Sequence, residues 1–146
     1  LQGKTVSVGE EESGTEQNAD QVLAACGLNQ RLVRTVNLNY TDAAAQLTDG
    51  SIDAMFVTAG LQADVLEGLA ADVGIRLLPV DEGVGERLLA AYPAYHACIV
   101  PAGTYTGQDA DVRTVGVQAL LLASNALPDD TVQALTANYF KTIDTV

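Results

Sequence analysis

Apolar and polar residues alternate along the chain with two different periods, one typical of strands and the other of helices. Short runs rich in β-branched residues are followed by segments in which apolar residues recur at helical spacing. In the last such segment Val132, Leu135, Tyr139 and Ile143 fall on one helix face. The pattern predicts strands at 5–8, 33–40, 52–58, 75–80 and 95–100, and helices at about 16–25, 41–49, 65–73, 84–92 and 127–143.

Repeated alternation of strands and helices with short connections is typical of an α/β fold. We therefore expect a mostly parallel sheet flanked by helices on both faces, built from residues 1–146 as a single domain. The longest expected loop is 102–111, and residues 115–124 are apolar almost throughout. Leu1 is not an initiator methionine, so we expect the chain to be cut or processed from a longer protein.

The net charge of the chain limits the classes of partner that it is expected to bind. Nineteen acidic residues face seven basic ones, which gives a formal net charge of −12. This charge argues against nucleic acid and anionic membrane surfaces, both of which attract basic proteins. Cys26 and Cys98 match no metal or redox spacing, and either a disulfide or two buried thiols would fit them.

The first candidate site follows the strand at residues 5–8. Ser13 and Glu16 stand at capping-box spacing, Gly14 allows close approach to the backbone, and Thr15 adds a hydroxyl. Free N–H groups at a helix start favour an anion such as a carboxylate. The spacing by itself favours the simpler interpretation, a capped helix and no ligand.

A second candidate follows the predicted strand at 52–58, where Thr58, Ala59 and Gly60 would leave main-chain donors accessible. A simple flexible turn explains them as well. Catalysis has no support, because the sequence has no nucleophile elbow, P-loop or dinucleotide motif. His96 is the single histidine and is expected to be a partly buried structural residue. We expect no enzyme activity, no cofactor and no metal.

Several short segments, in this order, resemble the second lobe of TAXI-type solute receptors of TRAP transporters. Each is modestly specific, and together they span nearly the whole chain. They are 3–9 with 13–16, 49–54 with 58–60, 75–79, 92–93, 101–105 with 107–109, and 112–115.

The resemblance implies a periplasmic-binding-protein-like fold of two α/β lobes, with the solute held between them. It implies a periplasmic or other extracytoplasmic, monomeric receptor that delivers a small carboxylate, such as glutamate or a dicarboxylate, to membrane permease subunits. At matching positions it implies that the solute contacts the residues Ser13, Gly14, Thr15, Thr58, Ala59 and Gly60, together with the less firmly matched Asn18 and Tyr105.

Two departures from the family pattern matter. The lobe expected before Leu1 is not in this chain, so we expect only half of the binding site and weak or undetectable solute affinity in calorimetry. Glu10, Glu11 and Glu12 replace small or neutral residues. Either they point to solvent, or one of them pairs with an ammonium group of the solute.

Other functions fit the same fold. A receptor for an ATP-driven importer and a ligand-sensing domain of a signalling protein are the main alternatives. An enzyme on the same scaffold would need an acid, base or nucleophile that this sequence does not supply.

Overall fold

The chain folds into strands and helices in the predicted order, except that no strand forms at 75–80 and an additional strand forms at 112–117. The computed structural model describes residues 1–29 and 31–143. Its elements are β1 (Thr5–Ser7), α1 (Gly14–Ala25), β2 (Arg34–Val36), α2 (Tyr40–Asp49), β3 (Ala54–Met55), α3 (Asp64–Asp72), α4 (Glu82–Ala91), β4 (Tyr95–Val100), β5 (Val112–Val117) and α5 (Asp129–Ile143).

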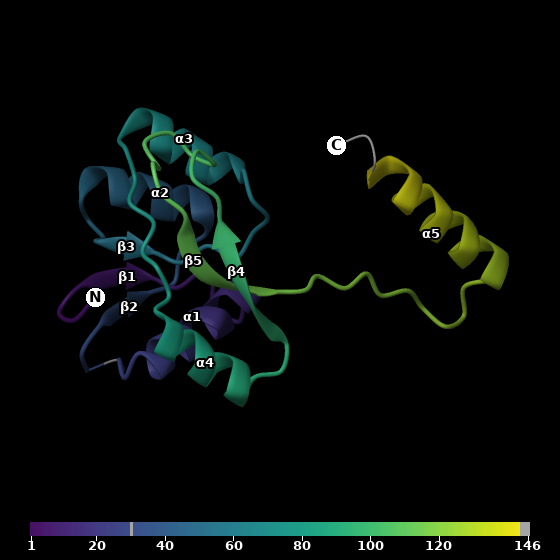
Figure 1. Cartoon of the computed structure of the whole chain (residues 1–146), viewed down its shortest axis with the longest axis horizontal. Coiled ribbons are helices and arrows are strands. Elements are labelled where there is room, and N and C mark those ends of the chain that lie inside the picture. The colour runs from purple at the N-terminus through teal and green to yellow at the C-terminus, as the bar shows by residue number, and fades with distance from the viewer. Residues whose placement is uncertain (30, 144–146) are drawn as a thin grey trace.

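β1 is the middle strand of a parallel sheet with the order β2-β1-β3. Thr5 pairs with Arg34, while Val6 pairs with Thr35 on one side and Ala54 on the other. The strands run parallel because a helix connects each one to the next. In Figure 1, α1 and α4 lie together on one side of the sheet and α2 and α3 on the other. The predicted α/β fold with helices on both faces is therefore confirmed.

The apolar core fixes α1 against this sheet. Val6 and Val8 lie two residues apart in and just after β1, and they pack with Ala19 and Leu23 of α1 and with Val33. All five side chains are buried. Burying a side chain of this size contributes roughly 1.5–3 kcal/mol. The N-terminus of α1 is thereby held at the carboxyl edge of the sheet.

An ion pair joins β1 to the segment that precedes β3. Lys4 Nζ donates to Asp53 Oδ1 at 2.8 Å, and the backbone N–H of Thr5 donates to Asp53 Oδ2 at 2.9 Å. Hydrogen bonding from Lys4, and then from the Thr5 N–H, lowers the pKa of the Asp53 carboxyl below its ordinary value. The carboxylate form of Asp53 is therefore the form that the fold favours.

One predicted strand is wrong and three are shorter than predicted, the first of them by a single residue. Residues 75–80 form no strand, although Val80 N donates to Arg113 O of β5 at 3.0 Å. Pro79 has no N–H to contribute to a ladder, which explains why the apolar run does not pair. β2 occupies only the first half of the segment predicted for it, and β3 only the middle of its segment.

The early end of β2 has a local cause. Asn39 is the N-cap of α2, and its side-chain oxygen accepts from Asp42 N at 2.9 Å. The helix predicted at about 41–49 therefore begins one residue earlier, because Asn39 caps it and brings Tyr40 into its first turn. Gly50 ends α2 in the left-handed region, which glycine adopts readily.

β4 and β5 form a separate antiparallel pair instead of extending the parallel sheet. β4 matches the strand predicted at 95–100, and the predicted loop 102–111 connects the two strands. The apolar run 115–124 is divided, because β5 ends at Val117 and an extended segment follows.

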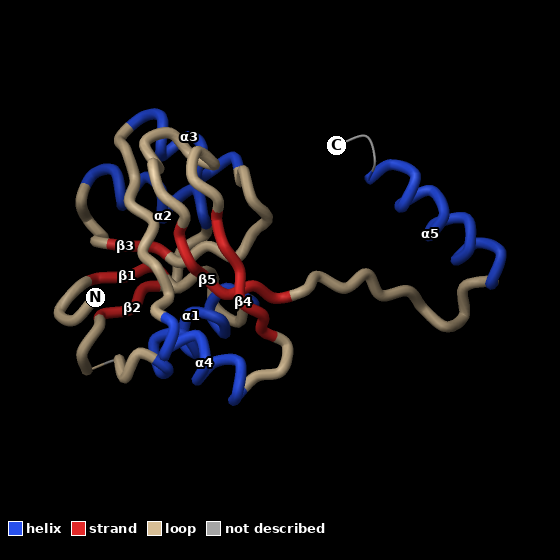
Figure 2. The backbone as a smooth tube through the Cα atoms, viewed as in Figure 1, coloured by secondary structure: helices blue, strands red, loops and turns tan. Residues whose placement is uncertain are grey.

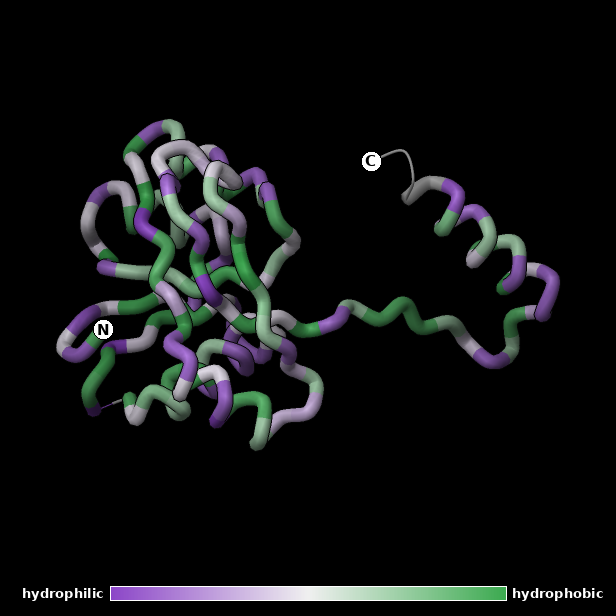
Figure 3. Tube along the Cα trace, in the orientation of Figure 1, coloured by the Kyte–Doolittle hydropathy of each residue, from purple (hydrophilic) through white to green (hydrophobic). Residues whose placement is uncertain are grey.

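This segment, residues 118–128, is here called the arm, and it leads to α5. Figure 2 shows the arm as a loop that holds α5 apart from residues 1–117, the α/β unit. Figure 3 shows a hydrophobic stretch along the arm, in which Leu121 is 86% exposed. The apolar face predicted for α5 is present at Val132, Leu135 and Tyr139, and all three side chains are exposed. The side chain of Ile143 lies outside the described part of the chain.

Both cysteines are free thiols. Cys98 is half-buried in β4, whereas Cys26 is exposed at the C-cap of α1. The expectation of two buried thiols is therefore wrong for Cys26, because the helix ends there and its last residue turns toward solvent.

Candidate functional site

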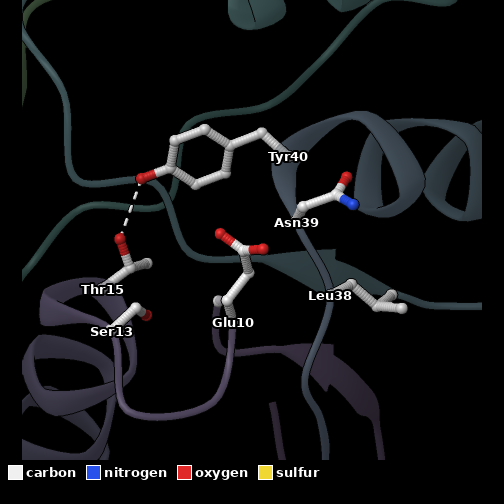
Figure 4. Close-up of a pocket in the computed structure, with 7 residues that line it drawn as sticks. Glu10, Ser13, Thr15, Leu38, Asn39 and Tyr40 are labelled. Carbon is white, nitrogen blue, oxygen red and sulfur yellow. Dashed lines mark hydrogen bonds between the residues drawn. The ribbon is translucent and has the colours of Figure 1, made fainter.

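A pocket opens beyond the carboxyl ends of β1 and β2, where α1 and α2 begin. This edge of a parallel sheet is where α/β proteins commonly bind ligands. The pocket has a volume of about 130 Å³. Its walls, seen in Figure 4, are Gly9, Glu10, Ser13, Thr15, Leu38, Asn39 and Tyr40.

The start of α1 forms one wall of this pocket. Ser13 is the N-cap, and its hydroxyl accepts from Glu16 N at 3.1 Å, as the capping-box spacing predicts. The Glu16 carboxylate reaches back to Glu12 N at 2.6 Å. Among the described residues, no hydrogen-bond partner is found for the N–H groups of Gly14 and Thr15. These two donors at the helix N-terminus can serve an anionic ligand.

Gly9 allows the chain to pass closely over α1. Its φ angle is +98°, in the region that favours glycine. A Cβ added at Gly9 would lie 2.8 Å from the Cβ of Thr15, which is too close for two carbon atoms. Gly9 therefore lets Thr15 lie against the loop that forms the floor of the pocket.

Tyr40 joins the two predicted sites. Its hydroxyl lies 2.8 Å from Thr15 Oγ1, accepts from Thr58 N at 3.0 Å, and lies 3.1 Å from Thr58 O. Asn18 Nδ2 also donates to Thr58 Oγ1, at 3.2 Å. The turn after β3 and the first turn of α1 therefore meet at one rim, as predicted, although Tyr40 was expected to be a strand residue.

Asn18 connects this rim to the β4–β5 pair. The Tyr95 hydroxyl lies 2.9 Å from Asn18 Oδ1 and 2.7 Å from Gln21 Oε1, and its single proton can be donated to one of them. Burial, followed by the nearby Tyr92 hydroxyl, raises the pKa of Tyr95. The phenol therefore stays protonated and holds the Asn18 side chain in place.

Glu10 is the one charged residue in the pocket wall. In Figure 4 its carboxylate lies between the start of α1 and the start of α2, facing the same space as Thr15 and Asn39. No ion pair to Glu10 is found among the described residues, and no lysine or arginine lines the pocket. Glu10 is exposed, as are Glu11 and Glu12, so Glu10 borders both the pocket and the solvent, and both interpretations of these glutamates stay predictions.

A comparison with protein families decides the classification. The NMT1-like family matches residues 1–146, which is the whole chain. The chain belongs to the NMT1-like family. This is a periplasmic-binding-protein-like family of solute-binding type, whose members are typically extracytoplasmic. Within the described part of the chain, no helix combines the length and apolar character needed to cross a bilayer.

The remaining predicted residues of this NMT1-like chain lie farther from the pocket. Ala59 and Gly60 are exposed in the turn after Thr58 and are not part of the pocket wall. Tyr105 is buried in the β4–β5 loop, where its N–H lies 3.3 Å from Gln108 Oε1. The roles predicted for these three residues stay predictions.

Sequence reasoning missed the wall that α2 contributes. Leu38, Asn39 and Tyr40 line the pocket, whereas the pattern indicated a strand through Tyr40. A signal was present, since Asn39 and Asp42 stand at the spacing of a helix start. Moving the helix start to Asn39 places Tyr40 at the carboxyl edge of the sheet, where its hydroxyl meets Thr15.

His96 is exposed, which corrects the expectation of a partly buried histidine. His96 and Cys98 share one face of β4 and lean over Gly116 of β5. A Cβ added at Gly116 would lie 2.9 Å from His96 Nε2 and 2.7 Å from Cys98 Sγ. Among the described residues no group of three or more His, Cys, Asp or Glu side chains could hold a metal ion.

Proposed function

We propose that the chain is a solute-binding lobe of a TAXI-type receptor of a TRAP transporter and works outside the cytoplasm. The lobe binds a small carboxylate solute and passes it to membrane permease subunits. Membership in the NMT1-like family supports the solute-binding part of this proposal. Permease coupling rests on the resemblance of the segments described above. The chain is proposed to act by binding and not by catalysis.

The observation that carries the proposal is the Tyr40 bridge between the start of α1 and the turn at Thr58. It holds the turn at Thr58 against the first turn of α1, so that two distant parts of the chain form one rim beside the free N–H groups of α1. In the proposed complex, the N–H groups of Gly14 and Thr15 donate to the solute carboxylate, and the Ser13 hydroxyl lies beside them. The dipole of α1 adds to this attraction for an anion.

The size of the pocket supports a shared site. Its volume of about 130 Å³ is well below the roughly 300–1,000 Å³ of ligand pockets that enclose a small molecule. We propose that a second lobe closes over this wall and excludes water from the solute. The α/β unit alone should bind weakly, because a half-open site leaves the ligand solvated.

NMR of the ¹⁵N-labelled chain tests the proposal. Titration with L-alanine should shift the amide signals of Gly14 and Thr15, with a Kd on the order of tens of millimolar because only one wall contacts the solute. Gly83 is a matched control, since it holds the same position in the first turn of α4 that Thr15 holds in α1. Absent shifts at Gly14 and Thr15, or equal shifts at Gly83, would show that α1 has no selective site.

A further inference from the structure

A histidine and a cysteine lie together on the β4–β5 pair, apart from the pocket. His96 and Cys98 are two residues apart in β4, so their side chains project from the same face of the strand. On β5 the register places Gly116 opposite His96 and Thr114 opposite Cys98. None of these four residues lines the pocket between α1 and α2. The pair is therefore separate from the site of the proposed function.

Gly116 allows the two side chains to converge. A Cβ at this position would lie 2.7 Å from Cys98 Sγ and 2.9 Å from His96 Nε2, closer than a Cβ atom normally comes to another group. The sulfur and the nitrogen thus lie near one common point, and a cation between them can contact both at metal–ligand distances of about 2.0–2.3 Å after small side-chain rotations. Any other residue at position 116 would place a side chain in front of both donor atoms.

Both donor atoms are available to a ligand. Among the described residues, no side-chain hydrogen bond or ion pair is found for His96 or Cys98, and Cys98 is a free thiol. His96 is exposed and Cys98 is half-buried, so ions can reach the pair from solvent. His96 is the single histidine of the chain and leans with Cys98 over Gly116. β4 therefore presents a thiol and an imidazole side by side, whereas the second thiol, Cys26, lies at the end of α1.

The number and type of donors indicate the class of cation. Thiolate sulfur is a soft ligand that selects copper(I), and imidazole nitrogen also suits copper. Zinc(II) takes four ligands in a closed site, and the described residues supply no group of three or more His, Cys, Asp or Glu side chains. Copper(I) and silver(I) accept two ligands in a nearly linear arrangement. The net charge of −12 also attracts cations to the chain.

We propose that His96 and Cys98 form a two-ligand site for a soft monovalent cation, copper(I) or silver(I), on one face of the β4–β5 pair. Binding breaks the S–H bond of Cys98, releases the proton to solvent and forms a metal–sulfur bond. The lone pair of His96 Nε2 supplies the second bond. No electron is transferred, so the cation keeps its oxidation state. The site does not depend on carboxylate binding in the pocket.

Silver(I) is the probe, because it needs no reductant. In Cys26→Ser the single thiol is Cys98, and in Cys98→Ser it is Cys26, which serves as the matched thiol without the histidine. In chloride-free buffer with reduced glutathione as competitor, Cys26→Ser should hold one silver ion per chain. It should bind this ion at least about 10-fold more tightly than Cys98→Ser, because the second ligand is already in place. The ring ¹⁵N signal of His96 Nε2 should shift with silver in Cys26→Ser and stay unchanged in Cys98→Ser.

Three further changes, each made in the Cys26→Ser chain, test the geometry. His96→Gln removes the ring nitrogen and should lower the silver affinity at least about 10-fold. Gly116→Ala places a methyl group in front of both donors and should also weaken binding, although neither donor is removed. Thr114→Val is the control, since it changes the residue opposite Cys98, keeps both donors and should keep the affinity.

The amide spectrum of each variant, compared with that of Cys26→Ser, shows whether the fold is retained. The ring ¹⁵N measurement needs no change at either donor, so it tests the site even where a variant fails to fold. Three results would each overturn the proposal: equal silver affinity of the two thiols, one silver ion shared between two chains, or a His96 ring signal that silver leaves unchanged in Cys26→Ser.

Discussion

Replacing Tyr40 by phenylalanine tests the bridge that builds the pocket. The change removes one oxygen and leaves the ring that lines the pocket wall. That oxygen contacts Thr15 Oγ1 at 2.8 Å and the N–H of Thr58 at 3.0 Å. Thr58 is exposed, so water can replace the lost partner there, whereas Thr15 is only 9% exposed and its hydroxyl is harder to solvate.

A buried group left without its partner costs about 1–3 kcal/mol. Since one of the two affected residues remains accessible to water, we expect Tyr40→Phe to lower the free energy of unfolding by about 1.5 kcal/mol. For a chain of this size that loss corresponds to a fall in Tm of roughly 3–6 °C. The signals of Thr15, Thr58 and Asn18 should also move in the amide spectrum, because the rim loses its central contact.

Chemical denaturation with a double-mutant cycle measures the effect. Thr15→Val removes the other hydroxyl, and the double variant should lose less stability than the sum of the single ones, with a coupling of about 0.5–1.5 kcal/mol. Tyr92→Phe is the control, since no hydrogen bond of the Tyr92 hydroxyl is found among the described residues. If Tyr40→Phe is no more destabilising than Tyr92→Phe, or if the two site changes are additive, the bridge does not hold the pocket together.

Three further predictions concern the fold around the site. Gly9→Ala should lower the free energy of unfolding in urea by about 2–4 kcal/mol, because the positive φ and a clash with Thr15 act together. The control is Gly50→Ala, which also has a positive φ but free space around it and should cost only about 1 kcal/mol. Because the pKa of Asp53 is lowered by folding, its contribution is complete above the unfolded pKa of about 3.9 and is lost as the pH falls through the folded value. Asp53→Asn should therefore have a lower free energy of unfolding than the wild type at pH 6, and this difference should shrink as the pH falls toward 2.5. A difference that is the same at both pH values would show that folding does not shift the pKa of Asp53. In sedimentation experiments the chain should self-associate as its concentration rises, because the arm exposes leucine side chains. Replacing the exposed arm residues Leu120, Leu121 and Leu122 by serine should reduce this association. A sedimentation profile that these replacements leave unchanged would contradict the prediction.

The sequence alone predicts the start or end of a helix where the residue responsible acts on its immediate neighbours. The start of α1 follows from Ser13 and Glu16, and the end of α2 follows from Gly50, because caps act within a few positions. The strand predicted at 75–80 is wrong because the apolar run there contains Pro79, which has no N–H for strand pairing. Pairing of β4 with β5 could not be derived, since the direction of a strand depends on partners chosen over the whole chain.

The same limit applies to the candidate site. Ser13 and Thr15 were predicted because a helix start is a local feature with a known affinity for anions. Tyr40 was missed because its role depends on Thr15 and Thr58, which lie far from it in sequence and meet it only in the folded chain. The position of Glu10 in the pocket likewise follows from the turn before α1, and the sequence alone left two orientations open.

The length of the arm limits how far α5 can lie from the α/β unit. Residues 118–128 can extend to roughly 35–40 Å, so α5 samples a limited volume around the α/β unit. A tether of that length corresponds to an effective concentration in the millimolar range. A contact between α5 and the α/β unit whose Kd between separate molecules is about 1 mM would therefore be about half occupied within one chain. It could open and close while the arm keeps the two parts close together.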